Sequence, residues 1–479
     1  MTPQFAIEAA VIDAPTIEAP AVQERAETIA PVWPDPPLRE AAPEGVRITR
    51  RQGPPQPLVA VIGLGPAGLP SAMALRRAGF RIVGIDTSAS RLSDIRSGRA
   101  EIVDSLGDDL RSHLHDEDFV LSDRIEVVHA AAHVLICVPP TLDAQRQPSF
   151  EALKRTCAAV VQHARAGQTL VLTSTSYVGS TRELLVEPLA ERGLRAGEDV
   201  FVAFSPERLD PGVREHEQAR TPRVVGAASE TCFARVSQLL RHIGERLHRV
   251  SSPEAAEMTK LYESTFRAVN VALACEMADA CRSHQLDPIE VTDAAATKPF
   301  GFMAHHPSAG VGGPGVGVEP YYLLRPLRER GRPVTFAEEA MRTLAARPRS
   351  VAMRAHELLM RSGQRLRDAR VLVVGASYKP GVADCTRSPA VEIITTLSAE
   401  GVQVDFHDPL VSTLRIDGEE VYGVDPDPRR DASGFGPEDY DLVIVVVKQP
   451  GYDYGWLARC PQVLDCTYRE QAGRRRVLP

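Results

Sequence analysis

Lysine is scarce in this sequence: its 479 residues contain five lysines and fifty arginines. A surplus of positive charge is also absent, because the net charge is −8. Binding to nucleic acid needs a basic patch that neutralises phosphates, so this balance argues against nucleic acid as the main partner. Where lysine persists, an ammonium group is indicated rather than a guanidinium. Three of the five, Lys260, Lys298 and Lys379, fall inside the motifs described below.

Long hydrophobic runs and cysteine pairs are also missing. No apolar run approaches the roughly 20 residues that a transmembrane helix needs, which predicts no membrane span. The N-terminus carries acidic residues and no basic region, so it is not read as a secretory signal. The eight cysteines include no CxxC pair and no disulfide framework. These features predict a cytoplasmic protein with reduced thiols.

The chain is long enough for several domains, and its patterns divide it into four segments. Residues 1–57 contain eleven prolines and no sustained apolar period, which predicts a disordered arm rich in proline and alanine. Residues 58–215 alternate buried apolar strands with helical patterns. Residues 216–363 read as a helical central domain with one long helix over 254–283. Residues 364–479 restart the alternation of strand and helix.

Alternating strands and helices predict an α/β fold. Each end of the sequence has an apolar strand, a glycine turn and a second strand that ends in aspartate. We therefore predict two Rossmann-like, doubly wound lobes joined by the helical domain. The long helix has an amphipathic pattern, and its apolar residues are Met258, Leu261, Phe266, Val269, Leu273 and Met277.

A dinucleotide fingerprint opens the first lobe. Gly63, Gly65 and Gly68 form a GxGxxG turn between a strand and a helix, and Asp86 ends the second strand 18 residues later. Gly63 allows the tight turn, Gly65 lets the backbone approach the pyrophosphate, and Gly68 permits close packing. An acidic residue in the position of Asp86 accepts hydrogen bonds from ribose and disfavours a 2′-phosphate. The pattern predicts NAD as cofactor, and the second lobe, with only Gly375 and Lys379, is expected to bind a different nucleotide.

Several motifs together resemble one enzyme family, the UDP-glucose, UDP-N-acetylhexosamine and GDP-mannose 6-dehydrogenases. The similarity spans about residues 58–470. The motifs are VIGLGPAGLP (61–70), ICVPPTLD (136–143), STSYVGST (174–181), SPERLDPG (205–212), AEMTKLYESTFRAVN (256–270), ATKPFGF (296–302), GVGGPGVGVEPYYL (310–323) and GASYKPGVADCTRSPAVEI (375–393). ATKPFGF most resembles the branch acting on UDP-N-acetylglucosamine and UDP-N-acetylgalactosamine.

The resemblance implies an enzyme that oxidises the C6 alcohol of a nucleotide sugar with two NAD, through a cysteine thioester. Val138 and Pro139, in the second motif, are assigned to the cofactor site. Thr175 matches the threonine that positions the catalytic water, and it also lies at the cofactor. Glu207 matches the acid/base of thioester hydrolysis. Lys260 matches the lysine that stabilises the oxyanion and contacts the substrate.

Other positions depart from the family pattern. The catalytic cysteine is replaced by Gly315, in a loop similar to GVGGHCIPVDPYYL. The asparagine four residues after the lysine is Ser264, and the assisting aspartate is Glu319. In the last motif Lys379 fits as a substrate ligand. The arginine expected at 386 is Thr386, and Arg387 stands beside it as a candidate replacement.

Glycine forms no covalent intermediate, so three interpretations remain open. The first is an NAD-dependent oxidoreductase of a UDP-sugar alcohol, with C6 the favoured position and the chemistry limited to two-electron or redox-neutral steps. The second is a non-catalytic homologue that binds NAD and nucleotide sugar. The third is a four-electron dehydrogenase with a replacement nucleophile. No metal site is predicted, and the resemblance implies a homodimer built on the long helix.

Overall fold

The computed structural model describes residues 57–98, 110–113, 116–143, 147–210, 220–416, 418–426 and 436–468, and the backbone of residues 476–477. The predicted N-terminal arm, up to residue 56, lies outside these residues. Within the described part of the chain, no helix is long and apolar enough to cross a membrane.

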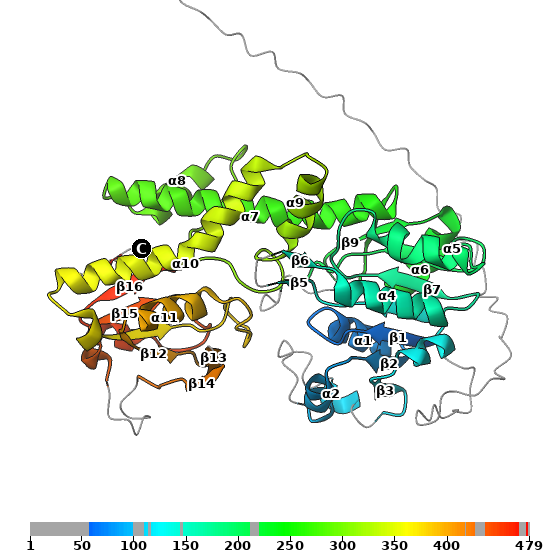
Figure 1. The fold of residues 1–479 in the computed structure, drawn as a ribbon, viewed down its shortest axis with the longest axis horizontal. Helices are drawn as coiled ribbons and strands as arrows, with labels where there is room; N and C mark the ends of the chain where they lie inside the picture. Colours follow the sequence, from blue (N-terminus) through cyan, green and yellow to red (C-terminus); the bar gives the residue numbers. More distant parts are fainter. Residues whose placement is uncertain are drawn as a thin grey trace, which may run out of the picture. The chain divides into compact units, whose positions relative to one another are not determined.

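An eight-stranded sheet forms the first lobe (Figure 1). The strand order is β10-β9-β8-β7-β4-β1-β2-β3, and β8 and β9 form its antiparallel pair. The strands are β1 (Leu58–Ile62), β2 (Arg81–Ile85), β3 (Phe119–Ser122), β4 (His133–Ile136), β7 (Thr169–Leu172), β8 (Phe201–Phe204), β9 (Arg223–Ala227) and β10 (Leu247–Val250). The central strands are apolar on both faces because helices cover both, as in other doubly wound sheets.

Two hydrophobic cores flank this sheet. Val59 and Val61 point to the core shared with α1, α2 and α6, whereas Ala60 and Ile62 point to the core shared with α4 and α5. The helices are α1 (Gly68–Arg77), α2 (Ala89–Arg96), α4 (Glu151–His163), α5 (Glu187–Glu191) and α6 (Glu230–Leu240).

The predicted boundary after residue 215 falls inside this lobe. Strands β9 and β10 extend its sheet as far as Val250, so the segment that follows residue 215 is not purely helical. The sequence pattern misses β10 because this strand lies at the sheet edge, where its side chains are half-buried or exposed and form no apolar run.

Four helices come next, drawn in green to yellow in Figure 1. They are α7 (Pro253–Ser283), α8 (Pro288–Ala296), α9 (Glu319–Glu329) and α10 (Thr335–Arg361). The long helix begins cleanly because the Ser252 side chain accepts a hydrogen bond from the backbone of Ala255, and Pro253 occupies the first turn.

The apolar residues of the α7 pattern do not all face the core. Leu261 is buried and Val269 is half-buried, whereas the other four residues of the pattern are at least 41% exposed: Met258, Phe266, Leu273 and Met277. Small residues such as Ala268 and Ala272 face the neighbouring helices instead. Periodicity identifies an apolar face of a helix but does not show what covers it.

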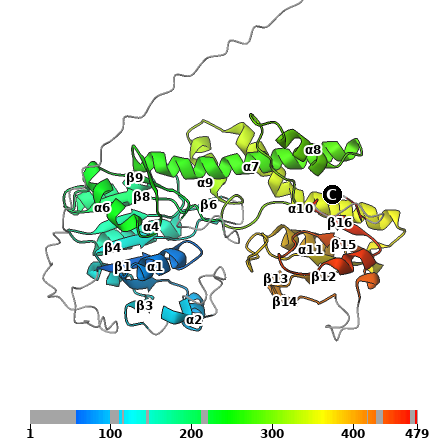
Figure 2. The same cartoon turned by 180° about the vertical axis from the view of Figure 1, so that it is seen from behind.

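The second lobe has a five-stranded parallel sheet with the order β12-β11-β15-β16-β17. The strands are β11 (Arg370–Val374), β12 (Gln403–His407), β15 (Leu442–Val445), β16 (Val463–Asp465) and β17 (Arg476–Val477). Helix α11 (Pro389–Ala399) and the end of α10 pack on one face of this sheet (Figure 2). Two short hairpins, β13–β14 (Thr413–Ile416, Glu419–Tyr422) and β5–β6 (Thr141–Leu142, Pro148–Ser149), complete the described strands. The predicted fold class is confirmed.

Candidate active site

The glycine turn between β1 and α1 has the geometry of a dinucleotide site. Gly63 has a φ of +85°, and a Cβ there would lie 2.6 Å from the carbonyl oxygen of Cys137. A Cβ on Gly68 would lie 1.8 Å from the oxygen of Gly63. Gly65, in contrast, has no atom within 4 Å of its Cβ position. The first and last glycines are therefore required by packing, and the middle one leaves its backbone open to a ligand.

Asp86 stabilises this turn from the end of β2. Its carboxylate accepts hydrogen bonds from the backbone N–H of Leu64 and of Ser88, both at 2.9 Å. Arg91 on α2 donates from Nε to the carbonyl oxygen of Leu64 at 2.9 Å. Each carboxylate oxygen keeps a second lone pair, and the side chain is half-exposed, so Asp86 fits a ribose diol.

The segment after β4 lies beside the same turn. The Cβ position of Gly63 is 3.1 Å from the backbone nitrogen of Val138. Val138 is half-buried and the following Pro139 is exposed. The structure thus brings the predicted cofactor residues of the first lobe to one edge of the sheet, where the carboxyl ends of β1, β2 and β4 meet.

Four predicted catalytic residues meet at Glu319. Thr175 donates its hydroxyl to Oε1 of Glu319 at 2.8 Å, and Lys260 Nζ lies 3.2 Å from the same oxygen. Ser264 donates to Oε2. Thr175, Ser264 and Glu319 are 7%, 7% and 5% exposed, so this cluster is almost closed to bulk water. A buried carboxylate with a lysine partner and two hydroxyl donors is a chemically satisfied group.

Three separate elements supply this cluster. Thr175 lies in the loop that follows β7, Lys260 and Ser264 lie four residues apart on one face of α7, and Glu319 is the first residue of α9. The backbone N–H of Glu319 donates to the carbonyl oxygen of Gly315 at 2.8 Å, which begins the helix. The Glu319 side chain thus reaches both Thr175 on the loop and Ser264 on α7.

Gly315 lies one turn before Glu319. Its backbone is not left-handed, and no atom lies within 4 Å of its Cβ position. Neighbouring glycines are different, because a Cβ on Gly312 or Gly313 would collide with Tyr378 at 2.6 Å. Glycine is therefore required by packing at 312 and 313 but not at 315, where a side chain fits without rearrangement.

Glu207 pairs with a different partner. The buried Arg223 donates from Nη1 to Oε2 of Glu207 at 3.0 Å, and the backbone of Arg208 donates to Oε1. The charges of Glu207 and Arg223 also act on Cys137, which follows β4. Burial, and then the charge of Glu207, raise the pKa of the Cys137 thiol to about 12. A thiol with this pKa stays protonated, so Cys137 is a poor nucleophile.

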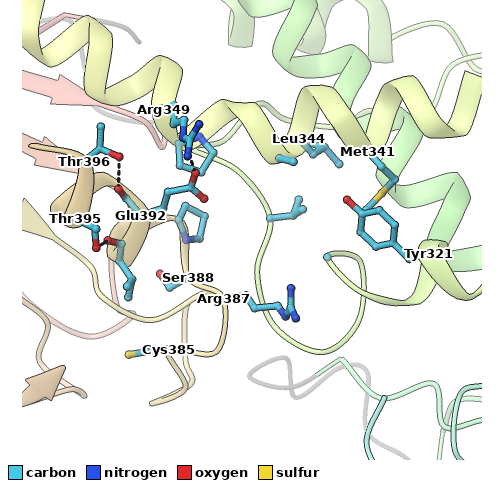
Figure 3. Close-up of a pocket in the computed structure, with 16 residues that line it drawn as sticks. Tyr321, Met341, Leu344, Arg349, Cys385, Arg387, Ser388, Glu392, Thr395 and Thr396 are labelled. Carbon is cyan, nitrogen blue, oxygen red and sulfur yellow. Dashed lines mark hydrogen bonds and ion pairs between the residues drawn. The ribbon is translucent and has the colours of Figure 1, made fainter. Parts of the chain in front are cut away.

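The two predicted substrate ligands of the second lobe take different surroundings. Lys379 forms an ion pair with Asp210, in the motif that contains Glu207. Arg387 has a left-handed backbone with a φ of +53° and reaches the carbonyl oxygen of Leu142 at 3.5 Å. Arg387 also lines a cavity of about 480 Å³ between α10, α11 and the glycine loop, with Ser388, Cys385 and Tyr321 (Figure 3).

Sequence reasoning missed two residues at this site. Arg223 is the ion-pair partner of Glu207, and Glu257 on α7 holds the segment after Thr175 by four hydrogen bonds. An acid one turn before Lys260, on the inward side of a helix, was the available signal for Glu257. No such signal existed for Arg223, because it is the first residue of an apolar strand, a position that many surface arginines share.

Comparisons with known proteins agree with this geometry. Three domains of the UDP-glucose/GDP-mannose dehydrogenase family match: the NAD binding domain at 58–244, the central domain at 254–343 and the UDP binding domain at 372–467. The match to the NAD binding domain confirms the predicted cofactor. It also includes β9, consistent with the longer first lobe.

Individual relatives are similar over most of their length. The UDP-N-acetyl-D-glucosamine 6-dehydrogenase of Pseudomonas aeruginosa is 30% identical over 77% of this chain and 86% of its own. The UDP-N-acetyl-D-mannosamine dehydrogenase of Pyrococcus horikoshii is 30% identical over 74% and 84%. A solved structure of the UDP-D-ManNAc dehydrogenase of Pyrococcus horikoshii superposes with a TM-score of 0.77 at 26% identity, covering 88% of this chain and 98% of that one. By its three matched domains and its relatives, this chain belongs to the UDP-glucose/GDP-mannose dehydrogenase family of NAD-dependent oxidoreductases.

Proposed function

We propose that this protein oxidises an alcohol of a UDP-sugar, at C6, by two electrons and stops at the aldehyde or returns the hydride within the same site. The observation that supports this is the contrast around Glu319. The groups needed for the first oxidation are assembled, whereas Gly315 presents no side chain at the position of the family's nucleophile.

The residues of the cluster have distinct roles in this proposal. The glycine turn, which is open at Gly65, would hold NAD, and NAD would accept the hydride. The ammonium of Lys260 stabilises the negative charge that develops on the substrate oxygen. The carboxylate of Glu319 receives the hydroxyl proton, and Thr175, which donates to Oε1, orients that carboxylate. Ser264 fixes the second oxygen.

The second oxidation lacks a nucleophile. Covalent capture of the aldehyde needs an activated thiolate close to the reacting carbon. Burial raises the pKa of Cys137 and of Cys157 to about 12, and burial also raises that of Cys275. These thiols remain protonated near neutral pH, which weighs against a replacement nucleophile among them. Without a thioester, Glu207 has no substrate for its predicted role in hydrolysis, and its proposed role is the ion pair with Arg223.

The proposed substrate class is based on the relatives and on the second lobe. The relatives from Pseudomonas aeruginosa and Pyrococcus horikoshii are named for UDP-N-acetyl-D-glucosamine and UDP-N-acetyl-D-mannosamine, so a UDP-N-acetylhexosamine is the proposed substrate. Lys379 and Arg387 are the proposed ligands of its nucleotide part. The pair between Lys379 and Asp210 would open or be shared when a diphosphate binds.

The alternative function is that of a non-catalytic binding protein. It is favoured by one observation: the Lys260 charge is already compensated by Glu319 in the free protein. Such a protein would bind NAD and nucleotide sugar as a regulator or as a subunit of a larger assembly.

Counting NADH formed per sugar consumed separates these functions. The protein is incubated with NAD and with either UDP-N-acetyl-D-glucosamine or UDP-N-acetyl-D-mannosamine. The sugar is followed by mass spectrometry, and a hydrazine traps any aldehyde. We expect one NADH and a trapped aldehyde, or an altered sugar without net NADH if the hydride returns. Two NADH and a free acid would contradict the two-electron limit, and an unchanged sugar would support the binding protein.

A Gly315→Cys variant provides the sharper test, with Gly315→Ala as its matched control. Both side chains fit the open space at this position, and they differ by the thiol. We expect the cysteine variant to form acid and a second NADH per sugar, and the alanine variant to behave like the wild type. Failure of the cysteine variant, with a wild type that is also inactive, would contradict both catalytic interpretations.

We also propose a homodimer formed through α7. Its apolar side chains Tyr262, Leu273 and Met277 are 65%, 50% and 51% exposed, along one face of the helix. Exposed apolar side chains at this density indicate a covered surface in the assembled protein. Light scattering that gives the mass of a single chain would contradict this.

A further inference from the structure

Glu257 on α7 is a fully buried acid with no role in the chemistry proposed for the Glu319 cluster. Its side chain is 0% exposed, yet it lies at the junction of two catalytic elements. It is one turn before Lys260 and two turns before Ser264, so all three side chains lie on the inward face of the helix.

Four hydrogen bonds reach the Glu257 carboxylate from three consecutive residues. Oε1 accepts from the Ser180 hydroxyl at 2.9 Å and from Thr181 through its backbone N–H at 2.8 Å and its hydroxyl at 2.6 Å. Oε2 accepts from the backbone N–H of Gly179 at 2.6 Å. Gly179 has a φ of +99°, a conformation that side chains rarely adopt. The carboxylate therefore fixes the end of one specific loop.

That loop carries Thr175. Its beginning is held by the first sheet, because Ser174 donates from its backbone and its hydroxyl to the carbonyl oxygen of Ile136, both at 3.1 Å. Its end is held by Glu257. Thr175, between these two anchors, donates to Glu319, and Glu319 contacts Lys260, which is on the same helix as Glu257. The contacts close a ring from α7 through the loop and α9 back to α7.

We propose that Glu257 is a positioning residue that sets the distance of Thr175 from Lys260 and Glu319. The inference rests on the proposed function for its effect on catalysis, but its geometric part does not. Burial of a carboxylate is costly unless its hydrogen bonds are complete, and here one loop supplies them. Burial raises the pKa of Glu257, while the bonds from Thr181 and Gly179 oppose that rise.

A neighbouring ion pair provides a matched control. Glu254, one turn earlier on α7, pairs at 2.8 Å with Arg182, which comes directly after the residues bound by Glu257. This pair joins the same two elements, but the Arg182 side chain is 54% exposed. Exposed pairs contribute little to stability. Glu254→Gln therefore removes a bridge between loop and helix without touching the buried carboxylate.

The test compares Glu257→Gln with Glu254→Gln by crystallography and by kinetics with NAD and UDP-N-acetylglucosamine. In Glu257→Gln, the amide N–H₂ faces donors, so we expect the hydroxyl of Thr175 to leave Glu319, beyond about 3.5 Å. We expect kcat to fall about 10- to 100-fold with an unchanged KM for NAD, since small displacements in an active site have effects of this size. Glu254→Gln should match the wild type in both measurements.

Thr181→Val covers the case in which Glu257→Gln does not fold. It removes one donor and keeps the carboxylate, and we expect a loss in kcat of about threefold, the size of one weak hydrogen bond. An intact contact between Thr175 and Glu319 in Glu257→Gln, or in Thr181→Val if Glu257→Gln does not fold, would overturn the proposal. So would a lost contact with kcat equal to that of Glu254→Gln. If the wild type leaves the sugar unchanged, the proposed function fails, and the crystallographic comparison still decides the role of Glu257.

Discussion

The two Rossmann-like lobes of this protein share the geometry of the glycine turn after their first strand, but only the turn of the first lobe is open to a ligand. In the first lobe, Gly63 has a φ of +85° and its backbone N–H donates to Ile85 at 2.8 Å. In the second, Gly375 has a φ of +90° and donates to His407 at 2.8 Å. A Cβ on either glycine would collide with the strand beside it, at the carbonyl oxygen of Cys137 or of Val447. The turn itself is therefore shared.

The lobes differ in the segment that leads from this turn to the next helix. In the first lobe α1 begins at Gly68, and the backbone at Gly65 stays open. In the second lobe α11 begins only at Pro389, so a longer loop follows the turn. The buried Gln449 fixes the start of this loop: its amide donates to Ser377, and its oxygen accepts from the backbone of Gly381. The first turn is therefore open to a dinucleotide, whereas the residues after the second turn are bound by the chain itself.

The aspartates that end the second strand of each lobe show the same division. Asp86 is half-exposed and accepts two backbone N–H groups. Asp408 is 7% exposed and accepts from Ala376, Ser377 and Leu410, with the amide of Gln449 also in contact. The same residue type is open to a ligand in one lobe and bound on all sides by its own chain in the other.

The largest expected effect comes from exchanging this second aspartate. Asp408→Asn replaces an acceptor of buried N–H groups by an amide that is itself a donor. We expect it to lower the free energy of unfolding by about 3 kcal/mol, because hydrogen bonds to buried charges are among the strongest. Chemical denaturation of the full chain measures this.

Asp86→Asn is the matched change in the first lobe. We expect a loss of only about 1 kcal/mol of stability, because Asp86 is half-exposed and accepts fewer bonds. Its main effect should be weaker NAD binding, measured by calorimetry. Equal losses of stability in the two variants would contradict the division of roles between the lobes.

A buried histidine makes a second difference between the lobes. In the first lobe, the strand paired with β1 is β4, and its His133 lies opposite Val59. In the second lobe, the strand paired with β11 is β15, and its Leu442 lies opposite Val371. Burial, with the charges of Arg235 and His242, lowers the pKa of His133 to about 4. The unfolded chain binds a proton near pH 6.5 and the folded chain does not, so stability is lost as the pH falls from about 6.5 to 4.

His133→Leu places in the first lobe the leucine that the second lobe has at the equivalent position, Leu442. At pH 5 the wild type loses about 2 kcal/mol of folding stability, because pH 5 lies about 1.5 units below the unfolded pKa of 6.5 and each unit corresponds to about 1.36 kcal/mol. We expect the variant to be free of this loss between pH 7.5 and pH 5. Denaturation at the two pH values measures the effect, and a wild type with equal stability at both would show that His133 is not responsible.

The sequence was most informative where local spacing determines geometry. The glycine turn, the aspartate at the strand end and the runs of β1 and β11 are predictable from patterns of a few residues. Contacts between distant segments were not. The contact of Thr175 with Glu319, 144 residues apart, was implied only by the family resemblance. Nothing in the sequence predicted the ion pair of Lys379 with Asp210. Exposure of the apolar face of α7 also depends on a covering surface that a sequence pattern does not contain.

A substitution at Gly65 tests the openness of the first turn directly. Gly65 and Gly315 both have open space at Cβ and a backbone that is not left-handed. We expect Gly65→Ala to weaken NAD binding at least about tenfold, or 1.4 kcal/mol, because the new methyl group occupies the approach of the pyrophosphate. Neither Gly65→Ala nor Gly315→Ala should change the stability of the free protein, and Gly315→Ala should bind NAD like the wild type. Calorimetric titration with NAD compares them. An unchanged affinity in Gly65→Ala would mean that the pyrophosphate does not approach the turn at this residue, and the contrast between an open first lobe and a filled second lobe would lose its functional meaning.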